Sequence, residues 1–195
     1  DGRGAIKGEI PEIADGSDKV IVEYWSDDSD LWNLRVDQIE YIKYDFFPEA
    51  CPGTQTECAG EFYISIYTRA TGAQTAFYDC RINYATATAI STGTGAEGEW
   101  TTLLIDFTDP GLTPTRSTAR NDGCPSHGSG DGSDTPYDVG VAGYVLGTGG
   151  TATGFIFALN MGDSVGGDNG LIGYFGEVQI KLVDEDAVRV YDFKP

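Results

Sequence analysis

The segment Gly154-Phe-Ile-Phe-Ala-Leu-Asn-Met-Gly-Asp163 is followed, after a loop, by Gly173-Tyr-Phe-Gly-Glu-Val-Gln-Ile-Lys-Leu182 and then by Val188-Arg-Val-Tyr-Asp-Phe193. Two sets of residues alternate along the first of these segments. One set is Phe155, Phe157 and Leu159, and the other is Ile156, Ala158 and Asn160. A period of two residues predicts a strand with one face more buried than the other.

The second segment shows a clearer alternation of apolar and polar side chains. The residues predicted to face the core are Tyr174, Val178, Ile180 and Leu182. The residues predicted to face outward are Phe175, Glu177, Gln179 and Lys181. Strands of this kind need an apolar sheet to pack on, so the rest of the chain must supply one.

Further strands are predicted along the chain at 5–10, 19–25, 31–47, 61–68, 75–84, 100–107 and 139–146. The run 31–47 is β-branched and aromatic, which favours one long strand, or two strands with a bulge near Asp37-Gln38; a helix from Leu31 to Ile42 is the alternative. The strands at 61–68 and 75–84 should form a hairpin. Residues 85–98 are either a weak edge strand or a loop.

These elements predict an all-β fold, an antiparallel two-sheet β-sandwich. The length of 195 residues suits one domain covering residues 1–195, and the 27 glycines suit many turns between short strands. A long irregular loop is expected at about 109–138, a length that is usually functional.

Charge and composition exclude several classes of partner. Twelve basic against 31 acidic residues give a net charge of −19, which disfavours binding to nucleic acid or to an anionic membrane surface. No apolar run is long enough to span a membrane, so no membrane insertion is expected. The chain opens at Asp1 without a charged and apolar leader, so we expect a signal peptide to have been removed.

Four cysteines lie in turn-rich surroundings and predict disulfides. We expect Cys51–Cys58 and Cys80–Cys124, although four cysteines allow three pairings. Zinc is the alternative, but the chain has no Cys-x-x-Cys motif and one histidine. Disulfides place the protein in an oxidising compartment, so we expect a secreted or cell-surface protein.

Several segments resemble carbohydrate-binding jelly-roll modules of secreted bacterial proteins. In Glu99-Trp-Thr-Thr-Leu-Leu-Ile-Asp-Phe-Thr-Asp109 a Trp opens an alternating run and an Asp closes it, as in a strand of such modules. The segments 160–163, 168–175 and 190–193 are similar to the ends of uncharacterised bacterial surface proteins, in which Phe77-Tyr-Asp-Cys80 also has a counterpart. The resemblance implies a sandwich of jelly-roll type, and secretion.

Catalytic motifs are weak. His127 lies in a Ser/Gly-rich loop without a nucleophile elbow, and we interpret it as a solvated loop residue. Carboxylates are too abundant for any pair to indicate hydrolysis. We therefore predict no catalytic residue.

Clusters of acidic residues in loops predict calcium, because this cation prefers several oxygen ligands from Asp, Asn and backbone carbonyls. The candidate ligands form three groups, which are Asp27, Asp28 and Asp30; Asp131, Asp134 and Asp138; and Asp163, Asp168 and Asn169. Ordinary turn chemistry is the alternative, since Asp-Gly and Asn-Gly pairs are common in turns.

Aromatic side chains could form a platform on which pyranose rings stack. The candidate faces are Trp25, Trp32, Tyr63, Tyr67 and Phe77, with Arg69, Arg81 and Asp79 as hydrogen-bonding partners. Tyr63 and Tyr67 alternate with the apolar Phe62, Ile64 and Ile66, which leaves them on the outer face of their sheet. Trp100 is expected in the core.

The sequence therefore predicts a non-catalytic extracellular carbohydrate-recognition module, stabilised by calcium and disulfides, with a polysaccharide or glycan as its partner. A structural subunit of a filament, matrix or surface layer, assembling through open strand edges, is the alternative. A polysaccharide lyase that uses a Tyr base and an Arg is a third hypothesis.

Overall fold

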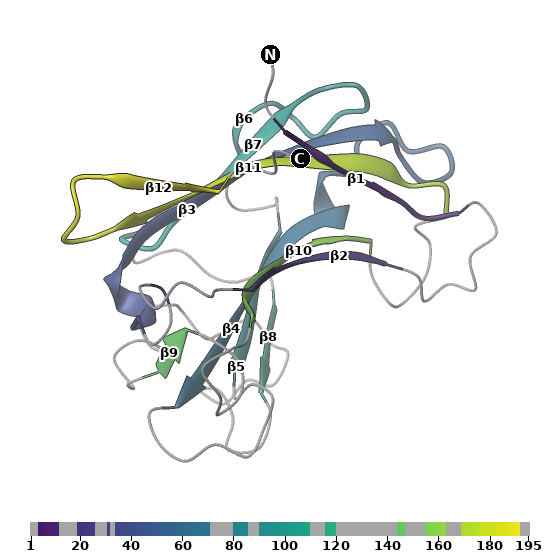
Figure 1. Ribbon diagram of the computed structural model, residues 1–195. Helices are drawn as coiled ribbons and strands as arrows, with labels where there is room; N and C mark the ends of the chain where they lie inside the picture. Colours follow the sequence, from purple (N-terminus) through teal and green to yellow (C-terminus); the bar gives the residue numbers. More distant parts are fainter. Residues whose placement is uncertain are drawn as a thin grey trace.

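The computed structural model describes residues 4–11, 19–25, 31, 34–70, 80–85, 90–109, 116–119, 144–146, 155–162 and 169–191. Within them the chain forms two antiparallel sheets that pack face to face (Figure 1). The expected all-β two-sheet sandwich is confirmed. No helix among these residues is long and apolar enough to cross a membrane.

The first sheet, sheet A, contains the longest strands. Its order is β1 (Ile6–Glu9), β11 (Ile172–Leu182), β3 (Ile39–Ala50), β7 (Thr101–Asp106) and β6 (Ile90–Thr92), and β12 (Val188–Tyr191) also pairs with β11. The β11–β3 ladder is the longest in the molecule as described, running from Ile172↔Ala50 to Leu182↔Ile39. These two strands form the middle of the sheet.

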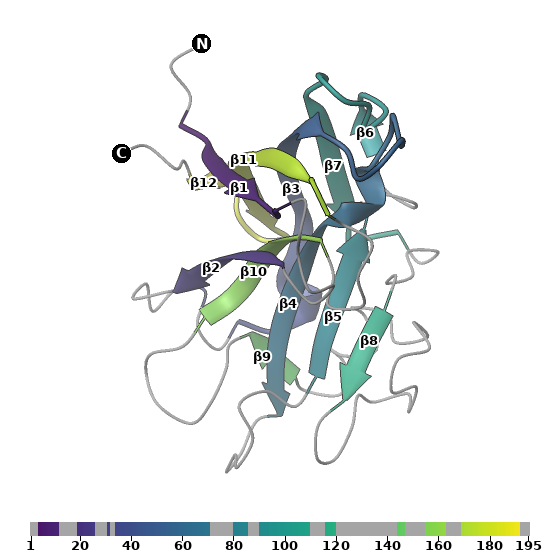
Figure 2. The ribbon, with the colours of Figure 1, turned by 90° about the vertical axis from the view of Figure 1, so that its right-hand side faces the viewer.

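The second sheet, sheet B, faces it and is seen in Figure 2 with β4, β5 and β8 side by side. Its order is β2 (Val20–Trp25), β10 (Phe155–Met161), β4 (Phe62–Ala70), β5 (Cys80–Ala85) and β8 (Arg116–Ala119), and β9 (Tyr144–Leu146) also pairs with β4. The predicted hairpin is present as the β4–β5 ladder, which starts at Thr68↔Cys80.

The order of the main strands identifies the topology of the sandwich. Strands β1, β11, β3 and β7 lie side by side in sheet A, and β2, β10, β4 and β5 lie side by side in sheet B. Consecutive strands early in the chain thus alternate between sheets, and the late strands β10 and β11 insert between the early ones. This is the strand order of a jelly roll.

The core between the sheets is held by aromatic contacts that join one layer to the other. Phe46 of β3 stacks on Phe62 of β4 with ring centroids 4.8 Å apart, and Phe175 of β11 lies edge-on to Phe62 at 5.6 Å. The hydroxyl of Tyr44 donates to the backbone oxygen of Phe62 at 3.1 Å. Gly173 leaves room for this packing, since a Cβ there would lie 2.4 Å from Cζ of Phe62.

The predicted directions of two neighbouring residues in β11, Tyr174 inward and Phe175 outward, were wrong. Phe175 is 2% exposed and belongs to the core, whereas Tyr174 is half-buried on the outer face. The reason is a β-bulge: Phe175 pairs with Phe46 and Val178 pairs with Tyr44, so β11 has one residue more than β3 between these pairs. The bulge restores the predicted inward direction of Val178, Ile180 and Leu182, which are buried.

The structure decides between the alternatives that the sequence left open for residues 31–47 and 85–98. Residues 39–50 form a strand, and a short 3-10 helix at Val36–Gln38 precedes it, so neither the Leu31–Ile42 helix nor a bulge at Asp37-Gln38 is present. Residues 90–92 form the short edge strand β6, and a loop continues to Trp100.

The prediction that one face of β10 is more buried than the other was also wrong. Ala158 and Asn160 are 0% and 1% exposed, and Phe157 and Leu159 on the opposite face are 2% and 0% exposed. Both faces of β10 are therefore covered.

Candidate functional site

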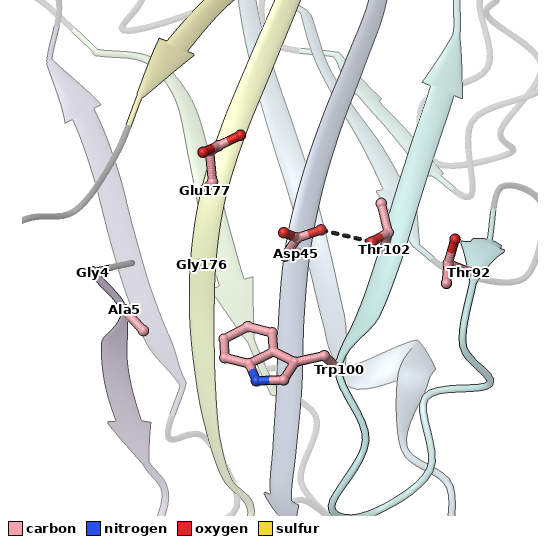
Figure 3. A pocket seen from close by; sticks show the side chains of 8 residues that line it. All are labelled: Gly4, Ala5, Asp45, Thr92, Trp100, Thr102, Gly176 and Glu177. Atoms are coloured by element: carbon pink, nitrogen blue, oxygen red, sulfur yellow. Dashed lines mark hydrogen bonds between the residues drawn. The ribbon is translucent and has the colours of Figure 1, made fainter. Parts of the chain in front are cut away.

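A groove of about 420 Å³ crosses the outer face of sheet A, the side away from the core. It is lined by residues from β3, β6, β7 and β11 and from the segment before β1 (Figure 3). These residues are Gly4, Ala5, Asp45, Thr92, Trp100, Thr102, Gly176 and Glu177. The floor of the groove consists of the paired strands β11, β3 and β7.

Trp100 is the largest side chain of the groove and is 50% exposed, so the prediction that it belongs to the core was wrong. It stands directly before β7, and its indole lies across β3 toward Gly176 of β11 (Figure 3). A Cβ at residue 176 would lie 3.1 Å from Cζ3 of the indole. The absence of a side chain at Gly176 thus allows the ring to lie low over the sheet.

Two more aromatic rings continue from Trp100 along the same face. The Phe47 ring lies 5.4 Å from the Trp100 ring, and the Tyr174 ring lies 6.0 Å from that of Phe47 in an edge-on arrangement. Phe47 and Tyr174 are half-buried. We call Trp100, Phe47 and Tyr174 the aromatic row.

The bulge in β11 positions the polar part of the groove. Gly176 and Glu177 together lie opposite Asp45 of β3, and Asp45 pairs on its other side with Thr102 of β7. Bulges are frequent next to functional sites because they redirect a side chain. Here the extra residue places Glu177 beside Asp45 on the outer face.

Hydrogen bonds hold both carboxylates of the groove. The hydroxyl of Thr102 donates to Oδ1 of Asp45 at 2.7 Å. The amide of Gln179 donates to Oε1 of Glu177. Each carboxylate is therefore oriented before a ligand arrives, which reduces the ordering that binding would require.

Charged residues surround the far end of the aromatic row. The hydroxyl of Tyr174 donates to Oε2 of Glu49 at 2.6 Å, and Nζ of Lys7 lies 3.7 Å from the same oxygen. Nζ of Lys7 is also 5.8 Å from the centre of the Tyr174 ring. The carboxylate of Glu49 raises the pKa of Tyr174 above its ordinary value, chiefly by accepting this hydrogen bond.

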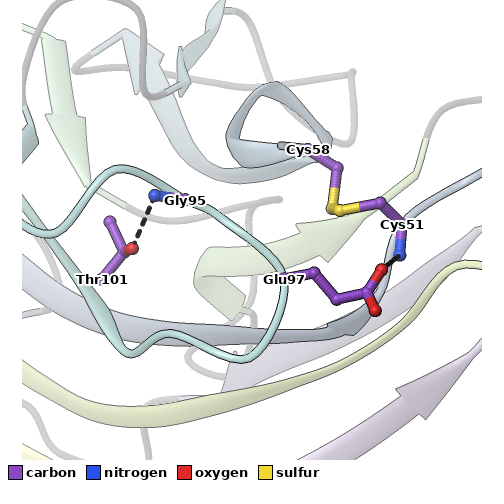
Figure 4. The surroundings of a disulfide bond; sticks show 5 residues. All are labelled: Cys51, Cys58, Gly95, Glu97 and Thr101. Carbon is purple, nitrogen blue, oxygen red and sulfur yellow. Dashed lines mark hydrogen bonds between the residues drawn. A yellow bond between two sulfur atoms is a disulfide. The ribbon is translucent and has the colours of Figure 1, made fainter. Parts of the chain in front are cut away.

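A disulfide supports the loop that carries Trp100. The predicted Cys51–Cys58 bond is present (Figure 4), and both cysteines are buried. The backbone NH of Cys51 donates to the carboxylate of Glu97 at 3.3 Å, and the NH of Cys58 donates to the backbone oxygen of Gly95 at 3.2 Å. The loop 51–58 and the loop 93–99 thus form one unit that ends at Trp100.

Close packing inside this unit depends on glycine. Gly95 has a φ of +76°, and a Cβ there would lie 2.2 Å from Cβ of Ala59. The NH of Gly95 also donates to Oγ1 of Thr101 at 2.8 Å, in the residue that follows Trp100. The disulfide loop is therefore linked to the start of β7 as well as to the loop before it.

The predicted sugar platform lies on the other sheet. Tyr63, Tyr67 and Arg69 of β4 share the outer face of sheet B, where Tyr67 pairs with Arg81 of β5. Tyr67 is only 6% exposed, so its ring does not present an open face and the predicted platform is corrected at this residue. Tyr63, Arg69 and Arg81 are half-buried.

Buried polar groups on this face are hydrogen-bonded to one another. Asn160 is 1% exposed, and its amide donates to Oγ of Ser65 at 3.1 Å and to the backbone oxygen of Ala158 at 2.9 Å. The hydroxyl of Ser65 donates in turn to Oδ1 of Asn83 at 2.9 Å. These side chains form a hydrogen-bonded layer on the outer face of sheet B.

Other predicted site residues lie wholly or partly outside the described part of the chain. The side chain of Trp25 lies outside the described residues, although its backbone ends β2, and Trp32, Phe77 and Asp79 lie outside them altogether. Of the predicted calcium ligands, Asn169 is described, and the others are not: Asp27, Asp28, Asp30, Asp131, Asp134, Asp138, Asp163 and Asp168.

Calcium and the second disulfide stay predictions from the sequence. The described part of the chain contains no group of three or more His, Cys, Asp or Glu side chains that could hold a metal ion. Cys124 and His127 lie outside it, as does the side chain of Cys80 in β5.

The alternation of the sequence contained a signal for the site that was missed. Thr101, Leu103 and Ile105 are buried, so Trp100 shares its direction with Thr102 and with the exposed Asp106. When a charged residue lies an even number of positions from an aromatic residue in one strand, the two share a face, and the charge indicates that this face is directed outward. The same reasoning applies to Phe47, because Asp45, Phe47 and Glu49 alternate with the buried residues of β3 and so point outward.

Comparisons of the chain with protein-family models, with curated proteins and with solved structures found no match. The groove and the aromatic row are the features of the described residues that bear on function.

Proposed function

We propose that this protein is a non-catalytic carbohydrate-recognition module that binds a glycan in the groove on the outer face of sheet A. The observation that carries the proposal is the half-exposed indole of Trp100, which lies across a groove lined by polar side chains. An exposed Trp beside a concavity is a common feature of ligand sites.

The chemistry of sugars matches this arrangement. A pyranose presents a flat patch of C–H bonds that packs on an aromatic face, and its hydroxyl groups need hydrogen-bond partners. Trp100 supplies the face, and Asp45 and Glu177 supply acceptors that Thr102 and Gln179 already orient. The aromatic row continues to Tyr174, which gives room for a chain of sugars.

The proposal is tested by binding of soluble oligosaccharides, first on a glycan array and then by calorimetry. Trp100→Ala should weaken binding of the best glycan at least about tenfold, which corresponds to ~1.4 kcal/mol. Gly176→Val should weaken it too, because the new side chain would push against the indole. Val190→Ala is the control, since Val190 is 52% exposed on β12, outside the groove.

Two outcomes would contradict the proposal. One is a set of array hits whose affinity is unchanged in Trp100→Ala. The other is release of reducing ends or of an unsaturated product absorbing in the ultraviolet from a bound polysaccharide, which would make the protein an enzyme.

A second function, self-assembly through strand edges, is favoured by β12. This strand pairs with β11 along one side, and its Val188 and Val190 are 37% and 52% exposed. Exposed valines on an edge strand are a surface on which a second copy of the chain could add a strand. Light scattering over a concentration series should then show oligomers in the wild type and monomers in Val190→Lys. Monomers of the wild type at every concentration would exclude it.

A further inference from the structure

The groove on sheet A follows a single line of neighbouring residues across the strands (Figure 3). In the order of the sheet from β1 to β6, this line consists of Ala5, Gly176 with Glu177, Asp45, Thr102 and Thr92. Thr102 pairs with Asp45 on one side and with Thr92 on the other, and Ala5 comes directly before the start of β1. The groove therefore runs across the sheet and not along one strand.

The sizes of the side chains explain why a groove forms along this line. Most of the lining residues are short, and Gly176 has no side chain. On one side stands the aromatic row, which Lys7 continues onto β1 because it pairs with Tyr174. On the other side, two residues further along the strands, stand the longer side chains of Gln179, Lys43 and Leu104. Short side chains between two lines of longer ones on the same face of a sheet leave a groove.

The groove reaches both ends of the strand order. Ala5 and Thr92, at the two ends of the line, are both exposed. Neighbouring strands lie about 4.8 Å apart, so the line across five strands is about 19 Å long. A volume of about 420 Å³ over this length gives a cross-section of about 20 Å², which suits one narrow chain.

Resting on the proposed function, we propose that the groove binds an internal stretch of a linear, unbranched glycan that lies across the strands from β1 to β6. A sugar unit in an extended chain advances it by about one strand spacing, so about four units occupy the groove. The indole of Trp100 packs on an inner unit, and the outer units lie over Ala5 and Thr92. Longer chains continue past both edges, so binding needs no chain end.

An extended peptide is the other linear ligand that fits a narrow groove. A peptide strand gains its affinity mainly from main-chain hydrogen bonds, which the edge of a sheet provides. This groove lies on the face of the sheet and presents side chains, among them an indole and two carboxylates. Stacking surfaces and side-chain acceptors suit rings with hydroxyl groups better than they suit a peptide main chain.

The first experiment measures how affinity depends on the length of the glycan. Calorimetry uses β-1,4-linked oligomers of glucose, mannose, xylose and N-acetylglucosamine, each from two to six units long, because these chains are extended. For the sugar that binds, affinity should rise with each unit up to about four units and change less than about twofold beyond that. Reduction of the terminal sugar to an alditol should leave the affinity of the hexamer within about twofold.

Variants at the two ends test whether the chain crosses the sheet. Ala5→Leu and Thr92→Leu add bulk at the ends of the line without adding a stacking ring or a hydrogen-bonding group. Each should lower the affinity for the hexamer at least about threefold and leave that for the trimer within about twofold, because a trimer avoids the blocked end. Thr108→Leu is the matched control, since Thr108 is exposed and is not among the residues that line the groove.

The outcomes separate this inference from the proposed function. Affinity that stops rising at two units, loss of hexamer binding after end reduction, or unchanged hexamer affinity in both end variants overturns the crossing chain and leaves glycan binding intact. No binding of any glycan, on the array or by calorimetry, overturns the proposed function itself. A tryptic digest of casein that displaces the hexamer overturns the preference for a glycan over a peptide. Thermal melts of each variant confirm that it is folded.

Discussion

The two outer faces of the sandwich differ in how far solvent reaches them. On sheet A the outward side chains of β3, β7 and β11 are half-buried or exposed, and Trp100 above the groove is 50% exposed. On sheet B, Ser65 and Asn160 are each 1% exposed, and their polar groups bond to one another. Alternation places both sets outward, so an outward direction in a strand does not by itself give an open surface. We therefore expect ligand binding on the first face and a larger contribution to stability from the second.

The largest effect should come from removing one aromatic ring from each face. Tyr67→Ala should cost about 3 kcal/mol of unfolding free energy or more, because Tyr67 is 6% exposed. Trp100→Ala should cost about 1 kcal/mol or less, since half of the indole is already in solvent. Urea unfolding measures both. Equal losses would show that the two faces are covered alike.

Breaking the disulfide should act mainly on sheet A. Replacing Cys51 and Cys58 together by serine should lower stability by about 2 kcal/mol, as expected for closing a short loop. It should also weaken glycan binding, because the loop 51–58 holds the loop 93–99 that leads to Trp100. Glu97→Gln is a milder test of the same link and keeps the disulfide. Unchanged affinity in the double serine variant would show that the groove does not depend on this support.

A smaller effect should distinguish the polar groups of the two faces. Asn160→Ala removes an amide that serves two buried acceptors and should cost about 1–3 kcal/mol in thermal or urea unfolding. Thr102→Val removes one half-buried hydroxyl and should cost about 1 kcal/mol or less. Its effect should be on affinity, because Asp45 loses the bond that orients it. The reverse order of the two stability losses would contradict the comparison.

The smallest expected effect concerns the pH dependence of Tyr174. Its pKa is raised in the folded protein, chiefly because its hydroxyl donates to Glu49. The stability from this bond is therefore fully present below the pKa of an unfolded tyrosine, and it is lost as the pH rises through the higher folded pKa. An ultraviolet difference titration against Tyr174→Phe isolates this phenol. In Glu49→Gln the phenol should ionise at lower pH, and an unchanged titration would show that Glu49 is not the cause.

The strands were predictable, because period-two alternation with apolar inward residues recurs in β3, β4, β7 and β11. The direction of Tyr174 and Phe175 was not, because a bulge adds a residue that alternation alone does not reveal. Gly176 was the available sign, since a glycine inside a strand often marks a bulge or a close approach.

The groove was harder to predict than the strands. Asp45, Thr102 and Glu177 are far apart in sequence, and only the register of β11, β3 and β7 brings them together. The platform expected around Tyr67 had the right kind of residues, but the burial of that face depends on long-range packing. The sequence indicated which kinds of residue a sugar platform needs, but it did not indicate which sheet face is accessible.

The bulge at Gly176 and Glu177 also has a consequence for how the protein can change over time. Deleting either residue would leave one residue on each strand between the pairs Phe175↔Phe46 and Val178↔Tyr44, so β11 would become regular while Val178, Ile180 and Leu182 kept their inward direction. The length of β11 can therefore change at this point without inverting the core, although the groove would lose one of its lining residues. A library of variants should therefore contain folded proteins that lack Gly176 or Glu177, and their affinity for the ligand should differ from that of the wild type.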